Sequence, residues 1–297
     1  MDHEPVLLHE VVAGLDLHPG LTVLDATLGS GGHSRAIGEA IGTTGKLIAL
    51  DADPEAVART RKSLVDLPCK TLFHAGNFRD LEKHFASLGI GSIDRALFDL
   101  GLSSPQLADP TRGFSFQTDG PLLMTWNGQD TGGLNAARLV NELSVPELAD
   151  IIARYGEEGY AQRITEAIVA GRRAGPILTT GQLVEIIAEA VPKSYRSGRK
   201  HFATKTFQAL RLATNDELGA LREGLAAVWC FLSPNSRLAV ISFHSLEARI
   251  VKKRFRDWVQ ANQGKLLTKH AIRPTHDEEV RNPRSRSATL RIISKII

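Results

Sequence analysis

The stretch "LTVLDATLGSGGHS", residues 21–34, joins a short apolar run to a cluster of glycines and then to a helical pattern. The apolar run ends at Asp25, and Gly29, Gly31 and Gly32 follow it. Glycine lets the backbone approach a bound group closely, and the amino end of the following helix favours polar or negative groups. The stretch therefore predicts a strand, a ligand-binding turn and a helix, the usual start of an α/β domain that binds a nucleotide or nucleoside.

Four further apolar runs share the form of the first, because each is short and ends in polar or glycine residues. With the run at Leu21–Thr27, they occupy Lys46–Asp53, Lys70–Phe78, Ile93–Gly101 and Arg237–His244. Short runs that are apolar throughout are typical of parallel strands buried on both faces. Helical patterns at Ser34–Ile41 and Pro54–Leu64 separate the first three runs, so the chain predicts a doubly wound α/β sheet.

The alternation of strands and helices stops in the middle of the chain. Between about Leu107 and Ala213 the sequence has no strand pattern, only a loop rich in glycine and proline followed by apolar residues at helical spacing. We therefore expect an α/β domain made of residues 1–107 and 214–297, interrupted by a helical subdomain of residues 108–213. The insertion follows the fourth strand, so it starts at the carboxyl edge of the sheet, where ligands bind in such folds.

The composition excludes several classes of protein. No apolar run is long enough to span a membrane, and the first ten residues are too polar for a signal peptide, so we expect a cytoplasmic protein without membrane contact. Cys69 and Cys230 lie far apart without a CxxC pair, which argues against disulfides and zinc clusters. The ten histidines show no metal-ligand spacing, so no metal site is predicted.

Basic charge is concentrated in two parts of the chain. Residues 1–244 carry 23 Lys and Arg against 28 Asp and Glu, or −5, whereas residues 245–297 carry 13 against 5, or +8. Clustered cations gain affinity for phosphates by releasing counterions, so the pattern indicates a polyanionic partner, with a solvated basic face as the alternative. The candidate residues are Lys193, Arg196, Arg199, Lys200, Lys205 and Arg211 in one cluster, and Arg284 and Arg286 in "NPRSRS".

Two carboxylates at strand ends limit the kinds of ligand that the site is expected to bind. A dinucleotide fingerprint would need glycine at position 34, which is Ser34, and it usually lacks a carboxylate such as Asp25 before its glycines. Asp25 instead suits a ligand with an ammonium group, and Asp51 lies where an acid can accept both hydroxyls of a ribose. S-adenosylmethionine has both features, so it is the expected cofactor. The alternative is that both acids only cap their strands.

The motifs taken together resemble the RsmH (MraW) family throughout the chain. They are "HEPVLLHE", "DATLGSGGHS", "DADPEA", "DLGLSSPQLADPTRGFSF", "DGPLLM", "ATKTFQALRL", "NDELGAL", "RLAVISFHSLE" and "NPRSRSATLR". The resemblance implies a class I S-adenosylmethionine-dependent methyltransferase that modifies the N4 amine of a cytidine in the decoding region of 16S rRNA, within the small ribosomal subunit. It also implies a cofactor site formed by Gly31, Gly32, His33, Asp51, Phe78, Asp99 and Gln106.

The candidates for contact with the N4 amine of the target cytidine lie in "DLGLSSPQ", residues 99–106. Amino-methyltransferases commonly place an acid, Asn or Ser before a proline there, followed by an aromatic residue. Here Ser103 and Ser104 supply hydroxyls and Pro105 fixes the turn, but no aromatic residue follows, so the match is loose. His244 at the end of the fifth strand is a further candidate, against the alternative of an ordinary strand-end histidine.

Two other functions stay open at this point. One is an amino-methyltransferase that acts on another nucleic acid or on a protein. The other is an RNA-binding assembly factor without turnover, because "GPLLMTW" replaces the family's usual "GPLDMRM" at Leu123, Thr125 and Trp126. For the methyltransferase, the expected RNA contacts are Lys200, Lys205, Arg211, Arg284 and Arg286. The sequence leaves both a monomer and a homodimer open.

Overall fold

The computed structural model describes residues 4–128, 132–198 and 200–297. The chain divides into two compact units: Met1–Ser103 with Leu218–Ile297, and Ser104–Glu217. The sequence placed these divisions at 107/108 and 213/214. The structure divides the chain at 103/104, because helix α5 (Ser104–Ala108) belongs to the helical unit. It divides the chain again at 217/218, because the helical unit extends to Glu217.

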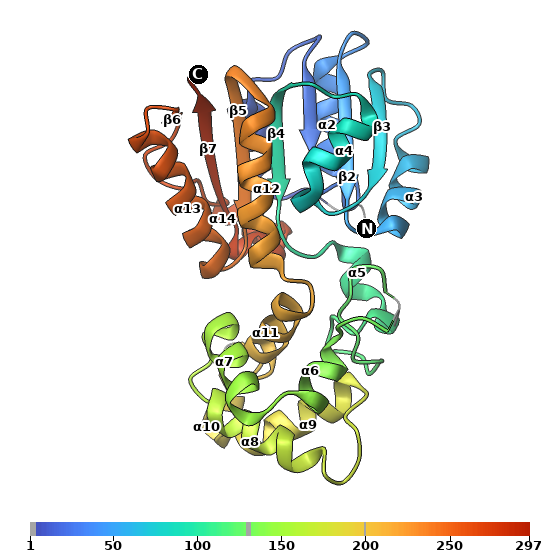
Figure 1. Cartoon of the computed structure of the whole chain (residues 1–297), viewed down its shortest axis with the longest axis vertical. Coiled ribbons are helices and arrows are strands. Elements are labelled where there is room, and N and C mark those ends of the chain that lie inside the picture. The colour runs from blue at the N-terminus through green and yellow to red at the C-terminus, as the bar shows by residue number, and fades with distance from the viewer. Residues whose placement is uncertain (1–3, 129–131, 199) are drawn as a thin grey trace. The chain divides into compact units, whose positions relative to one another are not determined.

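A seven-stranded sheet forms the centre of the first unit, with the order β3-β2-β1-β4-β5-β7-β6 (Figure 1). The first five strands run parallel, and β7 pairs antiparallel with both β5 and β6. Their bounds are β1 Thr22–Asp25, β2 Lys46–Asp51, β3 Lys70–Ala75, β4 Ile93–Asp99, β5 Leu232–Ser242, β6 Gly264–Leu266 and β7 Thr289–Lys295. The five predicted runs are thus confirmed as adjacent parallel strands.

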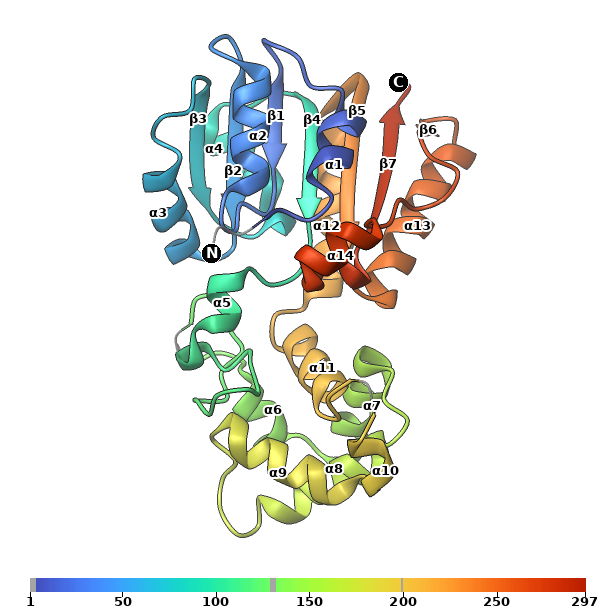
Figure 2. The same ribbon diagram turned by 180° about the vertical axis from the view of Figure 1, so that it is seen from behind.

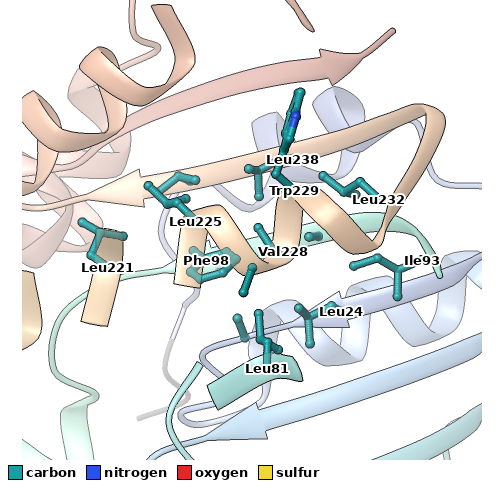
Figure 3. Packing of buried hydrophobic residues seen from close by; sticks show 14 of the residues in the cluster. Leu24, Leu81, Ile93, Phe98, Leu221, Leu225, Val228, Trp229, Leu232 and Leu238 are labelled. Carbon is teal, nitrogen blue, oxygen red and sulfur yellow. The ribbon is translucent and has the colours of Figure 1, made fainter. Parts of the chain in front are cut away.

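Alternate residues of the central strands point to opposite faces, and both faces are buried. On β1, Leu24 belongs to one apolar cluster and Val23 to the other. On β4, Phe98 and Leu97 divide in the same way. Burial on both faces explains why these strands are apolar throughout. Figure 3 shows the first cluster, in which helix α12 packs over β1, β4 and β5.

Helices cover both faces of this sheet (Figures 1 and 2). The cluster with Leu24 includes residues of α4 (Leu81–Leu88), α12 (Glu217–Phe231) and α13 (Ser245–Gln260). The cluster with Val23 includes residues of α1 (Leu8–Leu15), α2 (Gly32–Ile41) and α3 (Pro54–Ser63). Three short segments complete the unit: the 3-10 turn η1 (Phe78–Asp80), helix α14 (His276–Arg281) and the 3-10 turn η3 (Pro283–Ser287).

The strand order reverses at one point of the sheet, between β1 and β4. From β1 the chain adds β2 and β3 outward on one side and then returns to add β4 on the other side. Ligands of doubly wound sheets bind outside the carboxyl ends of the strands at this reversal. The ends of β1 and β4 are joined there, because Ala26 N–H donates to Leu97 O at 2.9 Å and Asp99 N–H to Thr27 Oγ1 at 2.7 Å.

The second unit is helical, as the sequence predicted. Its helices are α5, α6 (Ala136–Glu142), α7 (Val145–Gly156), α8 (Ala161–Gly171), α9 (Thr180–Ala190), α10 (Lys193–Arg196) and α11 (Thr204–Thr214), with the turn η2 (Pro110–Arg112). Among its described residues, the only β pairing is an isolated bridge between Pro121 and Thr179. Apolar residues at helical spacing in this segment, such as Leu148, Ile164 and Ile187, are fully buried. Over the described part of the whole chain, no helix is both long and apolar enough to cross a membrane.

Candidate functional site

The glycine loop after β1 is shaped by packing within the protein. Gly29 and Gly31 have φ values of +50° and +83°, which side chains rarely adopt. A Cβ on Gly31 would lie 2.5 Å from Thr60 Cγ2, and a Cβ on Gly32 would collide with the ring of Pro5. Gly31 therefore lets the loop pack closely against α3, and Gly32 lets it pack against Pro5 ahead of α1, whether or not a ligand is bound. The conformation leaves the amino end of α2 at the carboxyl edge of the sheet.

Asp51 ties this loop to the end of β2. Its Oδ2 accepts the Gly29 N–H at 2.7 Å, and its Oδ1 accepts the Asp53 N–H at 2.9 Å. Burial raises the pKa of Asp51 to about 6, although both backbone hydrogen bonds oppose the shift. Each carboxylate oxygen has a second lone pair, so Asp51 can still accept ribose hydroxyls while it holds the loop.

Asp25 lies beneath the loop and is only 1% exposed. Its Oδ2 accepts the Ser34 hydroxyl at 2.6 Å, and its Oδ1 accepts the Thr27 N–H at 3.1 Å. Burial is the largest influence on this carboxyl and raises its pKa, against the hydrogen bond from Ser34 and the charge of His33. Both oxygens thus have partners inside the protein, and the expected ammonium contact of Asp25 stays a prediction.

His33 and Asp99 bring together two residues that the family resemblance assigned to the cofactor. His33 is 6% exposed, and its Nδ1 lies 3.4 Å from Asp99 Oδ2 while its Nε2 lies 3.1 Å from Val6 O. Burial alone would lower the pKa of His33, but the hydrogen bond that its ring donates to Asp99 and the charges of Asp99 and Asp25 outweigh it, so the pKa is raised. A protonated His33 fits this acidic surrounding.

Asp99 provides a test of whether the site fits S-adenosylmethionine. Its Oδ1 is buried and has no hydrogen-bond partner among the described residues. A buried carboxylate oxygen without a donor costs free energy, which a bound donor would recover. The ammonium of the cofactor's methionine part is such a donor, and Asp51 offers an acceptor for its ribose. The chemistry of these acids therefore fits the expected cofactor.

Phe78 and Gln106 complete the residues assigned by resemblance. Phe78 begins η1 after β3, is half-buried, and packs edge-on against Phe98 with ring centroids 5.2 Å apart. Gly224 of α12 allows this position, because a Cβ there would lie 2.5 Å from Phe78 Cδ2. Gln106 lies on α5 in the second unit and is 4% exposed. The adenine contact of Phe78 and the cofactor contact of Gln106 stay predictions.

The candidates for the base amine come from a stretch that crosses between the two units. Ser103 ends the first unit, and Ser104 and Pro105 start helix α5 of the second. In the first unit, the Cβ of Ser103 lies 3.6 Å from the position a Cβ on Gly29 would take. Ser103 is therefore beside the glycine loop, and its contact with the base amine stays a prediction.

His244 follows β5 at the same edge of the sheet. Its Nε2 lies 3.2 Å from Glu247 Oε1, and its side chain faces the Glu247 backbone N–H in a capping box at the start of α13. Glu247 Oε2 accepts the Phe243 N–H at 2.8 Å, which fixes the turn into α13. The Phe243 ring packs 3.5 Å from where a Cβ on Gly101 would be, so the turn after β5 contacts the loop after β4. This juxtaposition was not visible from sequence spacing.

The expected RNA contacts differ in their exposure and in the partners that the structure gives two of them. Arg211 forms two hydrogen bonds with Glu217, at 2.8 and 2.9 Å, and Lys205 donates to Glu157 O at 2.8 Å. Both therefore have structural partners, which the sequence did not indicate. Lys200, Arg284 and Arg286 are exposed. Arg199 lies outside the described residues.

Further contacts that hold the site were missed by the sequence analysis. Glu278 of α14 accepts the Leu7 N–H at 2.8 Å and thereby joins the C-terminal region to the chain before α1. Thr27 orders the end of β4 through its hydroxyl. A separation of 271 residues leaves no pattern that could reveal the first contact. In the described ranges, no group of three or more His, Cys, Asp or Glu side chains could hold a metal ion.

Comparison with known proteins gives a consistent result over the whole chain. The model of the MraW methylase family matches residues 1–296. Proteins of Thermomicrobium roseum and Koribacter versatilis are each 47% identical, over 309 and 302 residues, covering 99% of this chain and 94% of each relative. A protein of Syntrophotalea carbinolica is 43% identical over 309 residues, covering 99% of this chain and 98% of its own. All three are named ribosomal RNA small subunit methyltransferase H.

Proposed function

This chain belongs to the MraW methylase family, and from that membership we propose that it transfers the methyl group of S-adenosylmethionine to the N4 amine of a cytidine in 16S rRNA. The observation that carries the proposal is the match of residues 1–296 to the family, together with relatives of nearly equal length named for rRNA of the small subunit. The sheet with its helices on both faces is that of a class I methyltransferase. A cytoplasmic location belongs to the same proposal.

The acids at the strand ends would hold the cofactor, which supplies an electrophilic methyl group on a sulfonium. Asp51 would accept the ribose hydroxyls, because its carboxylate already lies at the end of β2 and keeps lone pairs free. Asp99 Oδ1, which has no hydrogen-bond partner among the described residues, would accept the ammonium. His33 would keep Asp99 in place from the side of Oδ2, where their atoms lie 3.4 Å apart.

The chain's task at the substrate is to position a weak nucleophile. The N4 lone pair of cytosine is delocalised into the ring, so the amine reacts only when its nitrogen is aligned with the methyl group at about 3 to 3.5 Å. Acceptors for its N–H groups favour that alignment. We assign this role to Ser103, with Ser104 and the Pro105 turn in the following helix. His244, which follows β5 at the same edge of the sheet, is the second candidate acceptor.

No strong base is required by this scheme. Nitrogen attacks the methyl carbon as the carbon–sulfur bond breaks, and the cationic product then loses one N4 proton. That proton is acidic once the nitrogen carries the extra bond, so water or a nearby acceptor can take it.

The proposal is tested by transfer of tritiated methyl groups to small ribosomal subunits that lack the modification, with plasmid DNA and total protein as matched substrates. We expect label in 16S rRNA alone. Label in DNA or protein would show that the substrate is not 16S rRNA. Binding of the cofactor without label in any of the three substrates would indicate an assembly factor.

A further inference from the structure

Helix α13 carries a row of cations that the proposed reaction does not use. Residues 248–276 contain eight Lys and Arg against a single acid, Asp257. Four of the cations, Arg249, Lys252, Lys253 and Arg256, lie on α13 and are exposed. We call these four the α13 basic row.

The spacing of the row places it on one side of the helix. Residues at i, i+3, i+4 and i+7 share a face of an α-helix, and at 3.6 residues per turn these four span an arc of about 100°. The opposite side is buried through Val251, Phe255 and Trp258, which pack in the core of the first unit. The row therefore faces solvent because the apolar face of the same helix fixes its orientation.

Three of the four cations in the row have no acidic partner in the described part of the chain. No carboxylate lies within 4 Å of the side-chain nitrogens of Lys252, Lys253 or Arg256 in the described part of the chain, although Asp257 is only four residues from Lys253. Arg249 donates to Ser245 O at 3.2 Å within its own helix. By contrast, Lys83 and Arg35 on other helices of this unit pair with Asp80 and Asp66. Neighbouring like charges repel one another, so a row without acids fits an external polyanion.

The row starts close to the proposed reaction site. Helix α13 begins at Ser245, three residues after β5 ends at the carboxyl edge of the sheet, and it runs back along the sheet from there (Figure 1). At 1.5 Å per residue, the row extends from about 6 to about 17 Å along the helix from its first residue. This length matches a short segment of sugar–phosphate backbone rather than a single phosphate.

We propose that the α13 basic row binds the sugar–phosphate backbone of the rRNA next to the target cytidine, and so anchors the substrate to the cofactor-binding unit. The inference rests on the proposed function for the identity of the polyanion. The contact is independent of base sequence, because ammonium and guanidinium groups on a helix surface meet phosphates only. It is separate from the contacts expected of Arg284 and Arg286, which lie in η3.

The test compares two double variants with equal changes in charge. Lys252→Gln/Lys253→Gln removes two charges from the row, and Lys62→Gln/Lys70→Gln removes two exposed, unpaired lysines at α3 and β3 of the same unit. All four side chains are exposed, so both variants should fold, which an unchanged affinity for S-adenosylmethionine verifies. Binding of a 16S rRNA fragment containing the target, and of whole small subunits, is measured between 0.05 and about 0.2 M salt.

We expect the row variant to bind the fragment more weakly, by up to about 25- to 60-fold at 0.1 M salt, since two lost phosphate contacts each remove a counterion-release slope of about 0.7 to 0.9. The slope of log Kd against log salt should fall by about 1.4 to 1.8, and the control should stay within about twofold. The KM for RNA should rise with kcat unchanged.

Equal fragment affinities for the two variants would overturn the proposal. Weaker binding to whole subunits with unchanged binding to the fragment would also overturn it, in favour of a contact with a ribosomal protein. Binding is measured without methyl transfer, so the two proposals can fail separately. A wild-type protein that binds the fragment through this row but does not methylate it would refute the proposed function and still support the α13 basic row as an RNA-binding surface.

Discussion

Replacement of Asp51 by asparagine should change both the affinity for S-adenosylmethionine and its dependence on pH. Asp51 accepts the N–H groups of Gly29 and Asp53, and burial raises its pKa to about 6. Only the ionised carboxylate offers full acceptor strength to the ribose hydroxyls. The wild-type Kd should therefore be flat above pH 7 and rise about tenfold for each unit below pH 6, as one proton competes with the cofactor.

The asparagine variant keeps the size of the side chain but has one acceptor oxygen and no charge. Loss of a charged acceptor costs about 1.5 to 3 kcal/mol, so the Kd at pH 8 should rise by about 10- to 100-fold. The variant should also lack the inflection near pH 6. Isothermal titration from pH 5 to pH 8 measures both. A wild-type Kd that is independent of pH, or a variant that retains the same inflection, would refute the assignment to Asp51.

The same pKa has a consequence for the stability of the cofactor-free protein. A carboxyl with a raised folded-state pKa favours folding while it is protonated, and this contribution is lost as the pH rises from the unfolded value of 3.8 through about 6. The difference between the two pKa values corresponds to about 3 kcal/mol. Urea unfolding should show wild type losing stability relative to Asp51→Asn over this interval. A gain with rising pH would contradict the burial argument.

Three further substitutions test other parts of the account. Gly31→Ala should lower the free energy of unfolding by about 1 to 3 kcal/mol, because φ is +83° and its Cβ would lie 2.5 Å from Thr60 Cγ2; an unchanged melting temperature would show that the loop relaxes. His244→Gln should reduce kcat about tenfold without changing the Kd for the cofactor, and an unaltered kcat would return His244 to a structural role. Arg286→Gln should raise the KM for RNA and lower its salt slope by about 0.7 to 0.9, whereas weaker cofactor binding would mean that η3 has been misassigned.

The sequence was sufficient for the five parallel strands of the sheet but not for their full extent. The strand expected at Arg237–His244 begins at Leu232, because Leu232 pairs with Ile93 before an irregularity in the register, and Asn235 has a φ of +64°. Polar "SPNS" hides this part of β5 from a search for apolar runs. The helix at α13 was also missed, since its basic residues obscure a narrow apolar stripe.

The sequence predicted the strand-end positions of two candidate residues but not their contacts. Asp25 and Asp51 were placed correctly at strand ends, yet their partners are backbone amides and a serine hydroxyl of the loop between them, which residue type alone does not reveal. Arg211, whose contact with RNA stays a prediction, pairs with Glu217 six residues later, which the sequence did not indicate. Partners of this kind depend on side-chain orientation, which emerges only when the helices are in place.

The most direct test of the central claim is mass spectrometry of nucleosides from 16S rRNA, taken from subunits that lack the modification before and after incubation with this protein and S-adenosylmethionine. We expect N4-methylcytidine to appear at about one per subunit with the wild-type protein. We expect Asp99→Asn, which removes the proposed ammonium acceptor, to abolish most of it. Absence of N4-methylcytidine with the wild-type protein, or methylation of a different atom, would contradict the central claim.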